Sequence, residues 1–267
     1  MNLDGLIRNN TGDSTSDSCS MNQGDNDMTM SLVNWNVQWA TPRSKRTPKI
    51  LRRIEEHTPD VICLTESNIE LLAPGGYVIC SQSDYGYETA ENRRKVMLWS
   101  REPWDRVDDL GRESLPPGRY VSGVTNTPAG ELTVVGICIP WHGSRTEERQ
   151  GSGRKKAWED HESFLNSLSG VLSRLQDRPL VITGDFNQRI GQRGYSSRKL
   201  QSVLHDTMPE RVTIATSALG RAGRRSIDHI ALSDDLVAES LSVVSNIAGE
   251  SKLSDHFGVA AKLSIRR

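Results

Sequence analysis

Residues 180–191, LVITGDFNQRIG, decide the fold of this chain. The run begins with four residues that favour a buried strand and then reaches Asp185 and Asn187, two polar residues at its end. In an extended chain these two side chains lie on one side, and Gly184 lets backbone or a ligand approach closely. The stretch therefore predicts either a functional strand end or an Asx-rich turn, and the remaining sequence has to decide between them.

Composition is that of an ordinary globular protein, with 267 residues of which 35% are hydrophobic and 25% charged. Residues 1–30 are rich in Ser, Asn, Asp and Gly and lack a periodic apolar pattern. We therefore predict a disordered tail over 1–30 and one domain over 31–267. No secretory signal and no run of eighteen apolar residues is visible, so we expect neither secretion nor membrane insertion.

Four cysteines are present without a CxxC pair: Cys19, Cys63, Cys80 and Cys138. This pattern favours reduced thiols and a cytoplasmic location. The formal net charge of −1 predicts no general attraction to nucleic acid, so any electrostatic binding has to come from local patches.

Short apolar runs recur along the chain and predict about ten strands, enough for two sheets. The runs are 32–39, 61–65, 77–81, 96–99, 120–125, 132–139, 180–183, 227–232, 241–247 and 258–263. Three stretches have helical spacing instead: 45–58, 158–177 and 196–206. Because helices are few and each adjoins a strand, we predict an α/β or α+β class in which strands dominate.

The segment SLVNWNVQW places amides and apolar residues on opposite faces of one strand. Its amide face carries Asn34, Asn36 and Gln38, although Asn is depleted in strands. Two interpretations remain open from this segment alone: a solvent-facing edge strand, or a row of functional amides.

Three further segments place acidic residues or a histidine at strand ends. PDVICLTES ends a continuous apolar run near Glu66, and RRSIDHIALS places Asp228 on the apolar face of its strand. A buried carboxylate needs a histidine or a metal as partner. KLSDHFGVAAKL then offers Asp255 and His256 before the last strand. Each alone is compatible with a surface cap or a turn, but their recurrence at strand ends favours a shared site.

Six stretches in order resemble the endonuclease/exonuclease/phosphatase superfamily, which includes exonuclease III-like and apurinic endonucleases, DNase I-like nucleases and inositol-polyphosphate 5-phosphatases. The stretches are NWNVQW, PDVICLTES, VVGICIPW, ITGDFNQ, SIDHIALS and SDHFGVAAKL, which span residues 31–263. The resemblance implies a DNase I-like α/β fold: a four-layered sandwich of two packed, mainly antiparallel sheets flanked by helices, with a catalytic cleft at one end.

The resemblance also implies roles for individual residues. Asn36 and Glu66 would lie at a divalent metal, with Asp255 near it. Asp185 would orient or deprotonate the attacking water, and Asn187 would hold the phosphate or that water. Asp228 would hydrogen-bond His256, which would stabilise the phosphoryl oxygens or protonate the leaving group.

Elementary chemistry agrees with these implied roles. Phosphate-ester hydrolysis is very slow without a catalyst, so an enzyme has to supply a nucleophile and neutralise growing negative charge. Mg²⁺ or Mn²⁺ prefers oxygen ligands, and one or two carboxylates with amide oxygens suffice. No Cys/His cluster with zinc spacing competes for a metal.

Two departures from the family pattern are visible. Gln38 stands where many relatives carry an acidic residue or an asparagine, which leaves open whether one or two metals bind. Cys138 stands where relatives often carry a phosphate-contacting tyrosine. His142, four residues later, is a candidate for that role, and a loop histidine without a role is the alternative.

Basic residues flank the motifs and indicate the class of substrate. Arg145, Arg149, Arg154, Lys155 and Lys156 lie in one long loop, and Arg221, Arg224 and Arg225 precede the SIDHIALS motif. These runs either form a solvated surface or steer a polyanion. Trp141 either stacks on a base or belongs to the core.

We therefore predict a monomeric, Mg²⁺- or Mn²⁺-dependent phosphodiesterase acting on nucleic acid, with Arg224, Arg225 and Trp141 as substrate-binding residues. Within catalysis, the alternative is a hydrolase of a small phosphorylated metabolite or lipid head group. A catalytically silent nucleic-acid-binding relative is a third possibility, which the complete set of motif residues disfavours. RRSIDHIALS replaces the PAWCDRIL-like segment of inositol phosphatases and argues against that branch.

Overall fold

The computed structural model describes residues 29–72, 75–88, 90–111, 115–146, 155–175, 178–191 and 196–266. The predicted disordered tail lies outside the described residues up to position 28, and so do Arg149 and Arg154 of the long loop. The first strand begins at Thr29, so the last two positions of the expected tail belong to the fold. No helix within these ranges is long and apolar enough to cross a membrane.

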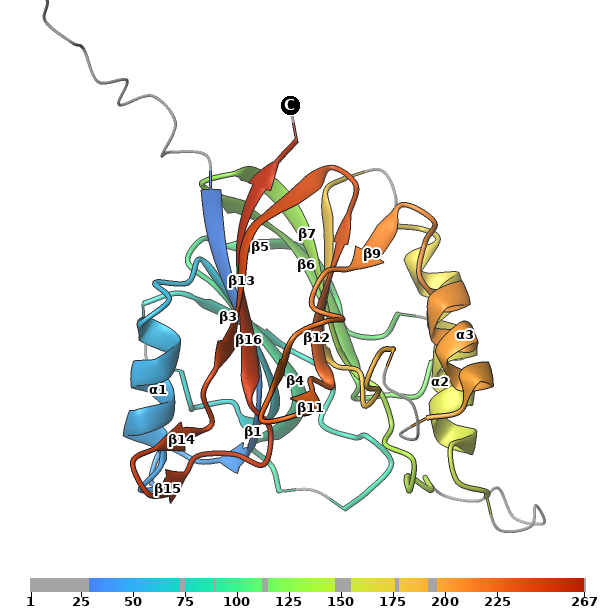
Figure 1. The fold of residues 1–267 in the computed structure, drawn as a ribbon, viewed down its shortest axis with the longest axis horizontal. Coiled ribbons are helices and arrows are strands. Elements are labelled where there is room, and N and C mark those ends of the chain that lie inside the picture. The colour runs from blue at the N-terminus through green and yellow to red at the C-terminus, as the bar shows by residue number, and fades with distance from the viewer. Residues whose placement is uncertain are drawn as a thin grey trace, which may run out of the picture.

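Two six-stranded sheets form the centre of the molecule (Figure 1). The first sheet has the order β13-β16-β1-β2-β4-β3. Its strands are β1 (Thr29–Ala40), β2 (Val61–Asn68), β3 (Tyr77–Cys80), β4 (Arg93–Ser100), β13 (Leu236–Val244) and β16 (Gly258–Ile265). Only β1 and β2 run parallel, and the other neighbours are antiparallel.

The second sheet has the order β5-β6-β7-β8-β12-β9 and the same design. Its strands are β5 (Trp104–Asp108), β6 (Tyr120–Thr127), β7 (Gly130–Cys138), β8 (Leu180–Asp185), β9 (Val212–Ile214) and β12 (Asp228–Ser233). Here β7 and β8 form the parallel pair. Two small hairpins complete the strands: β10 (Gly220–Arg221) with β11 (Arg224–Arg225), and β14 (Ile247–Ala248) with β15 (Ser251–Lys252).

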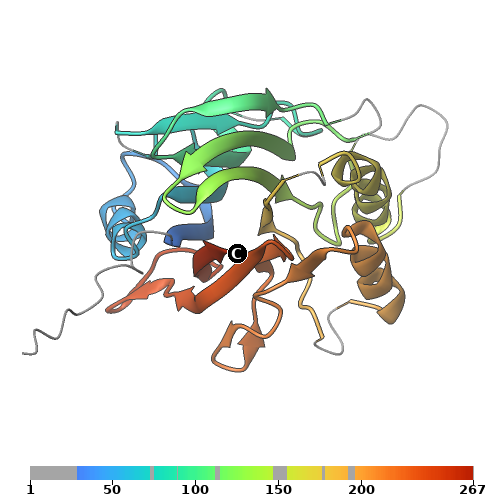
Figure 2. The same cartoon turned by 90° about the horizontal axis from the view of Figure 1, so that it is seen from above.

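Helices cover the outer faces of both sheets, which makes four layers (Figures 1 and 2). Helix α1 (Thr47–Glu55) packs on the first sheet, and α2 (Glu159–Leu172) with α3 (Arg198–Thr207) packs on the second. Three apolar clusters fill the interfaces: one between the sheets, and one beneath each helical layer. The predicted sandwich and its three helical stretches are confirmed.

The amide row of β1 faces the second sheet. Asn34 and Asn36 are buried, whereas Val33 and Val37 on the opposite face pack in the cluster beneath α1. Asn34 Nδ2 donates hydrogen bonds to the carbonyls of Gly184 (2.9 Å) and His229 (3.1 Å), which belong to β8 and β12. The edge-strand alternative is therefore wrong: β1 is an interior strand whose amides join the two sheets.

Candidate active site

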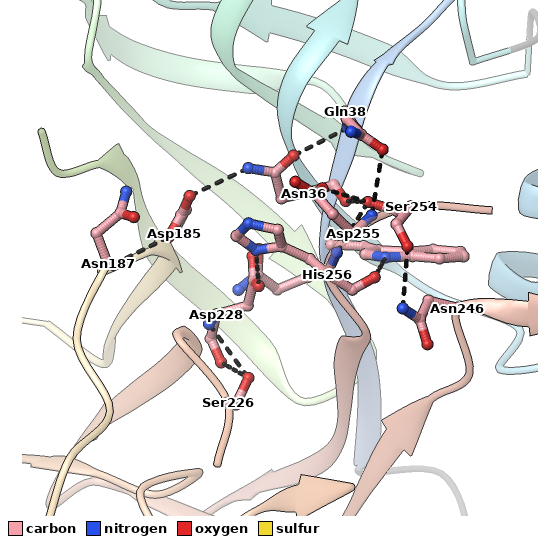
Figure 3. A network of polar contacts seen from close by, with 12 residues as sticks. Asn36, Gln38, Asp185, Asn187, Ser226, Asp228, Asn246, Ser254, Asp255 and His256 are labelled. Carbon is pink, nitrogen blue, oxygen red and sulfur yellow. Dashed lines mark hydrogen bonds and ion pairs between the residues drawn. The ribbon is translucent and has the colours of Figure 1, made fainter. Parts of the chain in front are cut away.

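The motif residues meet at one end of the sandwich, where β1, β2 and β8 end and β12 and β16 begin (Figures 1 and 3). This end is at the bottom of Figure 1. Opposite strand directions bring the carboxyl ends of some strands to the amino ends of others, so residues distant in sequence become neighbours. Asp185 and Asp228, for example, are directly paired in the β8–β12 ladder.

Asp185 is buried and accepts two hydrogen bonds. Asn36 Nδ2 donates to Oδ2 at 3.1 Å, and the backbone N–H of Asn187 donates to Oδ1 at 2.9 Å. Gly184 has φ +140°, and a Cβ there would lie 1.9 Å from the carbonyl oxygen of Ile137. Only glycine therefore lets β7 and β8 approach closely enough to hold Asp185 in this place.

The side-chain amide of Asn187 is hydrogen-bonded to the backbone. Its Nδ2 donates to the carbonyl of Ile139 at 2.9 Å, and its backbone has φ +51°. These contacts place the residue next to Asp185, as the sequence predicted, but its contact with a phosphate stays a prediction.

His256 and Asp228 form the predicted pair. Nδ1 of His256 lies 2.6 Å from Oδ2 of Asp228, which is fully buried. Burial disfavours the imidazolium, but the negative charges of Asp228 and Asp185 outweigh it and raise the pKa of His256 to about 10. Burial also raises the pKa of Asp228, against the opposing effect of His256. His256 is thus protonated at neutral pH and donates to Asp228.

The pKa of Asp185 lies close to neutral pH. Burial raises its pKa to about 7; His256 opposes this rise, while Asp228 and Glu66 add to it. Carboxylate oxygens of Asp185 and Asp228 and a ring nitrogen of His256 lie within 4.8 Å of one another. A carboxyl with a pKa near neutrality can accept a proton, and a protonated imidazole beside it can donate one.

Several contacts fix the loop that carries His256. The carbonyl of His256 accepts from Trp35 Nε1 at 2.9 Å, and its N–H donates to Ser254 Oγ at 3.2 Å. Ser254 Oγ in turn donates to the carbonyl of Asn36 at 2.6 Å. Gln38 Oε1 accepts from the Asp255 N–H at 3.2 Å (Figure 3). Gln38, which departs from the family pattern, therefore positions this loop.

Glu66 has a partner that the sequence did not predict. Lys95 Nζ, on the neighbouring strand β4, lies 2.6 Å from Glu66 Oε1. The Lys95 side chain is only 12% exposed, and its ammonium lies 4.9 Å from the Trp39 ring centre and 5.1 Å from that of Tyr85. These two rings stack at 5.9 Å. The aromatic pair and the carboxylate hold a fixed cation beside Glu66.

Four non-glycine residues of this region have a left-handed backbone. Their φ values are +48° for Gln38, +57° for Trp39, +48° for Glu66 and +51° for Asn187. Such conformations cost free energy and persist where surrounding contacts enforce them, which is common at functional sites. Here they turn β1, β2 and β8 at the point where each delivers its polar side chain.

The donor set fits a hard divalent cation. Glu66 supplies a carboxylate and Asn36 an amide on adjacent strands, and Asp185 contacts Asn36 directly. One oxygen of Asp228, Oδ1, is buried without a hydrogen-bond partner among the described residues. Oxygen donors of this kind suit Mg²⁺ or Mn²⁺. Lys95 Nζ already contacts Oε1 of Glu66. A metal cation bound here would therefore compete with this ammonium for the Glu66 carboxylate.

The remaining predicted residues lie around this centre. Asp255 is exposed and lines a cavity together with His256, Arg224 and Arg225. Trp141 is 51% exposed, so its alternative placement in the core is wrong.

His142 has its ring against those of Trp141 (4.7 Å between centres) and Trp158 (5.6 Å), and its carbonyl accepts from the Trp158 N–H. Its contacts in the described part of the chain are with these tryptophans, and its catalytic role stays a prediction.

Cys138, at the position that relatives often give to tyrosine, is buried at the end of β7 and paired with Asp185 in the ladder. Burial raises the pKa of its thiol to about 12, so the sulfur is neutral. Behind the site, Gln188 links two buried histidines: its Nε2 donates to His161 Nε2 (2.8 Å), and its carbonyl accepts from His229 Nε2 (3.0 Å). These neutral contacts stabilise the segment after Asn187.

Comparison with known proteins identifies the family of this chain. The model of the Endonuclease/Exonuclease/phosphatase family matches residues 33–256. No curated protein sequence matches the chain.

Similar solved structures include an endonuclease/exonuclease/phosphatase from Beutenbergia cavernae, with 17% identity and a TM-score of 0.58, covering 89% of this chain and 72% of that one. A 3′-5′ exonuclease from Neisseria meningitidis has 16% identity and a TM-score of 0.63, covering 88% and 100%. A humanised TDP2 from D. rerio has 15% identity and a TM-score of 0.60, covering 89% and 99%. At these identities the structures show the shared fold, and the family match over 33–256 shows that the chain belongs to the endonuclease/exonuclease/phosphatase family.

Proposed function

We propose that this protein is a divalent-metal-dependent phosphodiesterase whose substrate is nucleic acid. The observation that carries the proposal is the buried Asp185, with a pKa near 7, beside the His256–Asp228 pair. This arrangement provides a proton acceptor and a proton donor within one small volume, which hydrolysis of a phosphate ester requires.

Each residue of the chain has a separate task in this proposal. Asp185 accepts a proton from the attacking water, while Asn36 and the Asn187 N–H orient its carboxylate. His256, kept protonated by Asp228, stabilises the phosphoryl oxygens and donates a proton to the leaving oxygen. Glu66 and Asn36 would hold Mg²⁺ or Mn²⁺, which neutralises charge on the phosphate when bound.

Nucleic acid is the proposed substrate for two reasons. One similar structure is a Neisseria 3′ phosphatase bound to a product DNA hairpin, and another is a D. rerio TDP2 complexed with a single-strand DNA product. In this chain, Arg221, Arg224 and Arg225 line the cavity beside His256. We also propose that the protein is a monomer. A cytoplasmic location is proposed because Cys63, Cys80 and Cys138 are free thiols.

A substrate panel tests the proposal. The purified chain is incubated with DNA, RNA, abasic duplex and small phosphodiesters, in Mg²⁺, in Mn²⁺ and in EDTA. We expect metal-dependent cleavage of a nucleic acid. Cleavage of small phosphodiesters alone would favour the metabolite or lipid alternative. If no substrate shows metal-dependent turnover, an enzymatic role is refuted.

Two substitutions test the residue assignment. Glu66→Gln and His256→Ala should each lower turnover by at least about a hundredfold, the low end for loss of a general acid or an electrostatic group. His205→Ala is the matched control, because His205 is exposed on α3. Near wild-type rates in either test variant would show that the assignment is wrong.

A further inference from the structure

A cavity of about 420 Å³ opens beside His256, on the side of the β10–β11 and β14–β15 hairpins. Figure 1 shows both hairpins at the end of the sandwich where the site lies. Arg221 of the first hairpin donates to Ser245 Oγ, next to the second, so the two walls are joined. The volume is in the range of small-ligand sites and larger than a single phosphate requires.

The lining of this cavity is strongly cationic. Five basic side chains line it: Arg189, Arg221, Arg224, Arg225 and Lys252. Two carboxylates face them, those of Asp228 and Asp255, and Asp228 is already paired with His256. Because the whole chain has a net charge of only −1, this concentration of positive charge is local and points to an anionic ligand.

The basic residues divide into structural and exposed groups. Arg225 Nη1 donates to the carbonyls of Ile190 and Ser217, both at 3.1 Å, and so anchors the hairpin to neighbouring loops. Arg224 and Lys252 are exposed at the cavity. A wall that presents guanidinium and ammonium groups is suited to phosphate oxygens.

The lining also includes apolar side chains, which suit a group that carries the phosphate. Ile227, Ile247 and Phe257 lie in the same cavity as the basic residues. Such a mixture of apolar and cationic surface matches a sugar or base with an attached phosphate, whereas a bare inorganic anion would use only the cations.

We propose that this cavity binds the nucleotide unit next to the scissile phosphate and holds a second phosphate on Arg221, Arg224 and Lys252. The inference rests on the proposed function and narrows the substrate to one with two phosphates separated by a nucleoside. That chemistry occurs in a polynucleotide and in a small nucleoside bisphosphate.

Isothermal titration calorimetry of the full chain tests this site without requiring turnover. The probes are thymidine 5′-monophosphate, thymidine 3′,5′-bisphosphate and the tetranucleotide d(pT)₄, with Mg²⁺ present and ligand integrity checked by chromatography. The test variant is Arg221→Gln with Arg224→Gln, and Arg224→Gln alone is the second variant. Arg52→Gln with Lys199→Gln is the charge-matched control, because both residues are exposed on helices α1 and α3.

We expect wild-type protein and the control to bind the bisphosphate at least about tenfold more tightly than the monophosphate. The double variant should reduce this preference to below about threefold, and Arg224→Gln should give an intermediate value. Equal affinity for the two nucleotides in wild-type protein, or a preference that survives the double variant, would overturn the inference.

The third probe separates the two sources of the ligand. Tighter binding of d(pT)₄ than of the bisphosphate identifies a polynucleotide, and equal or weaker binding identifies a small nucleotide; either result supports the site if the arginine dependence holds. The proposed function is tested by a different measurement, metal-dependent cleavage. If the preference for the bisphosphate is intact but no cleavage occurs, the phosphate site is supported and the phosphodiesterase activity is refuted.

Discussion

Lys95 shows how one residue changes the chemistry expected of its neighbour. Sequence motifs predict that Glu66 is a metal ligand, but they do not reveal the ammonium 2.6 Å from its carboxylate. Ladder partners Thr65↔Val96 and Ser67↔Arg94 bracket Glu66 and Lys95 and place them opposite each other on β2 and β4. In sequence, Lys95 is one basic residue in the run RRK, a pattern that is usually solvated.

The first prediction concerns metal affinity. Lys95→Met removes a positive charge that repels a divalent cation at Glu66, so Mn²⁺ should bind at least about tenfold more tightly, as measured by electron paramagnetic resonance. Lys49→Met is the control, because Lys49 is exposed on α1. An unchanged or weaker Mn²⁺ affinity in the Lys95 variant would mean that Lys95 does not compete with the cation.

The second prediction concerns pH dependence. In the proposed mechanism, catalysis needs ionised Asp185, whose pKa is raised to about 7 chiefly by burial, and protonated His256, whose pKa the nearby carboxylates raise to about 10 despite burial. Because the proposed turnover needs a bound divalent cation, which favours the charged carboxylate, the rate should rise with pH at or below about 7 and fall near 10.

Asp228→Asn provides the check on this profile. It removes the carboxylate that holds the imidazolium, so the alkaline limb should move down by at least about one pH unit. The measurement is kcat/KM for a chromogenic phosphodiester between pH 5 and 11. An alkaline limb that stays in place would show that it does not report His256.

At the scale of elements, Asn34 connects the two sheets at the point where β8 approaches the site. The alternation of polar and apolar residues around Asn34 predicts a strand with one polar face. Alternation alone does not show whether that face contacts water or a second sheet. The long apolar strands and the three helices were predictable for the same physical reason, because their periodicity reflects burial. Strands β5 and β9 and the two hairpins were not, because their strands are only two to five residues long, too short for alternation to be recognised.

The third prediction follows from this connection. Asn34→Leu leaves the carbonyls of Gly184 and His229 without their donor, although it also removes the buried, unpartnered Oδ1 of Asn34. We expect a loss of unfolding free energy of about 1–3 kcal/mol in urea denaturation, with reduced turnover because Gly184 precedes Asp185. Asn166→Leu, on the exposed face of α2, should change neither quantity. Wild-type stability for Asn34→Leu would show that these hydrogen bonds do not hold the sheets together.

At the scale of the whole molecule, charge is distributed unevenly over a nearly neutral chain. The motifs at the strand ends predicted that the residues of the candidate site lie together, because each motif carries its own polar residue next to an apolar strand. The cavity beside it was not predictable as a cavity, because its two hairpins are separated in sequence and meet through the Arg221–Ser245 contact. Fold-level similarity also leaves the substrate open, since one fold hosts many functions.

The fourth prediction uses salt to measure this uneven charge. Binding of a labelled single-stranded oligonucleotide should weaken with increasing salt, because each phosphate neutralised by the protein releases counterions. Arg221→Gln with Arg224→Gln weakens neutralisation of the one second phosphate and should flatten the slope of log K against log salt by about 0.7, whereas Arg52→Gln with Lys199→Gln should leave it unchanged. The slope is measured by fluorescence anisotropy between 50 and 300 mM KCl, over which the Debye length falls from roughly 14 to 6 Å. All proteins carry Glu66→Gln, so that the oligonucleotide is not cleaved. Equal slopes for the two double variants would place the polyanion on a surface other than the cavity, because only contacts with the phosphate backbone change this slope.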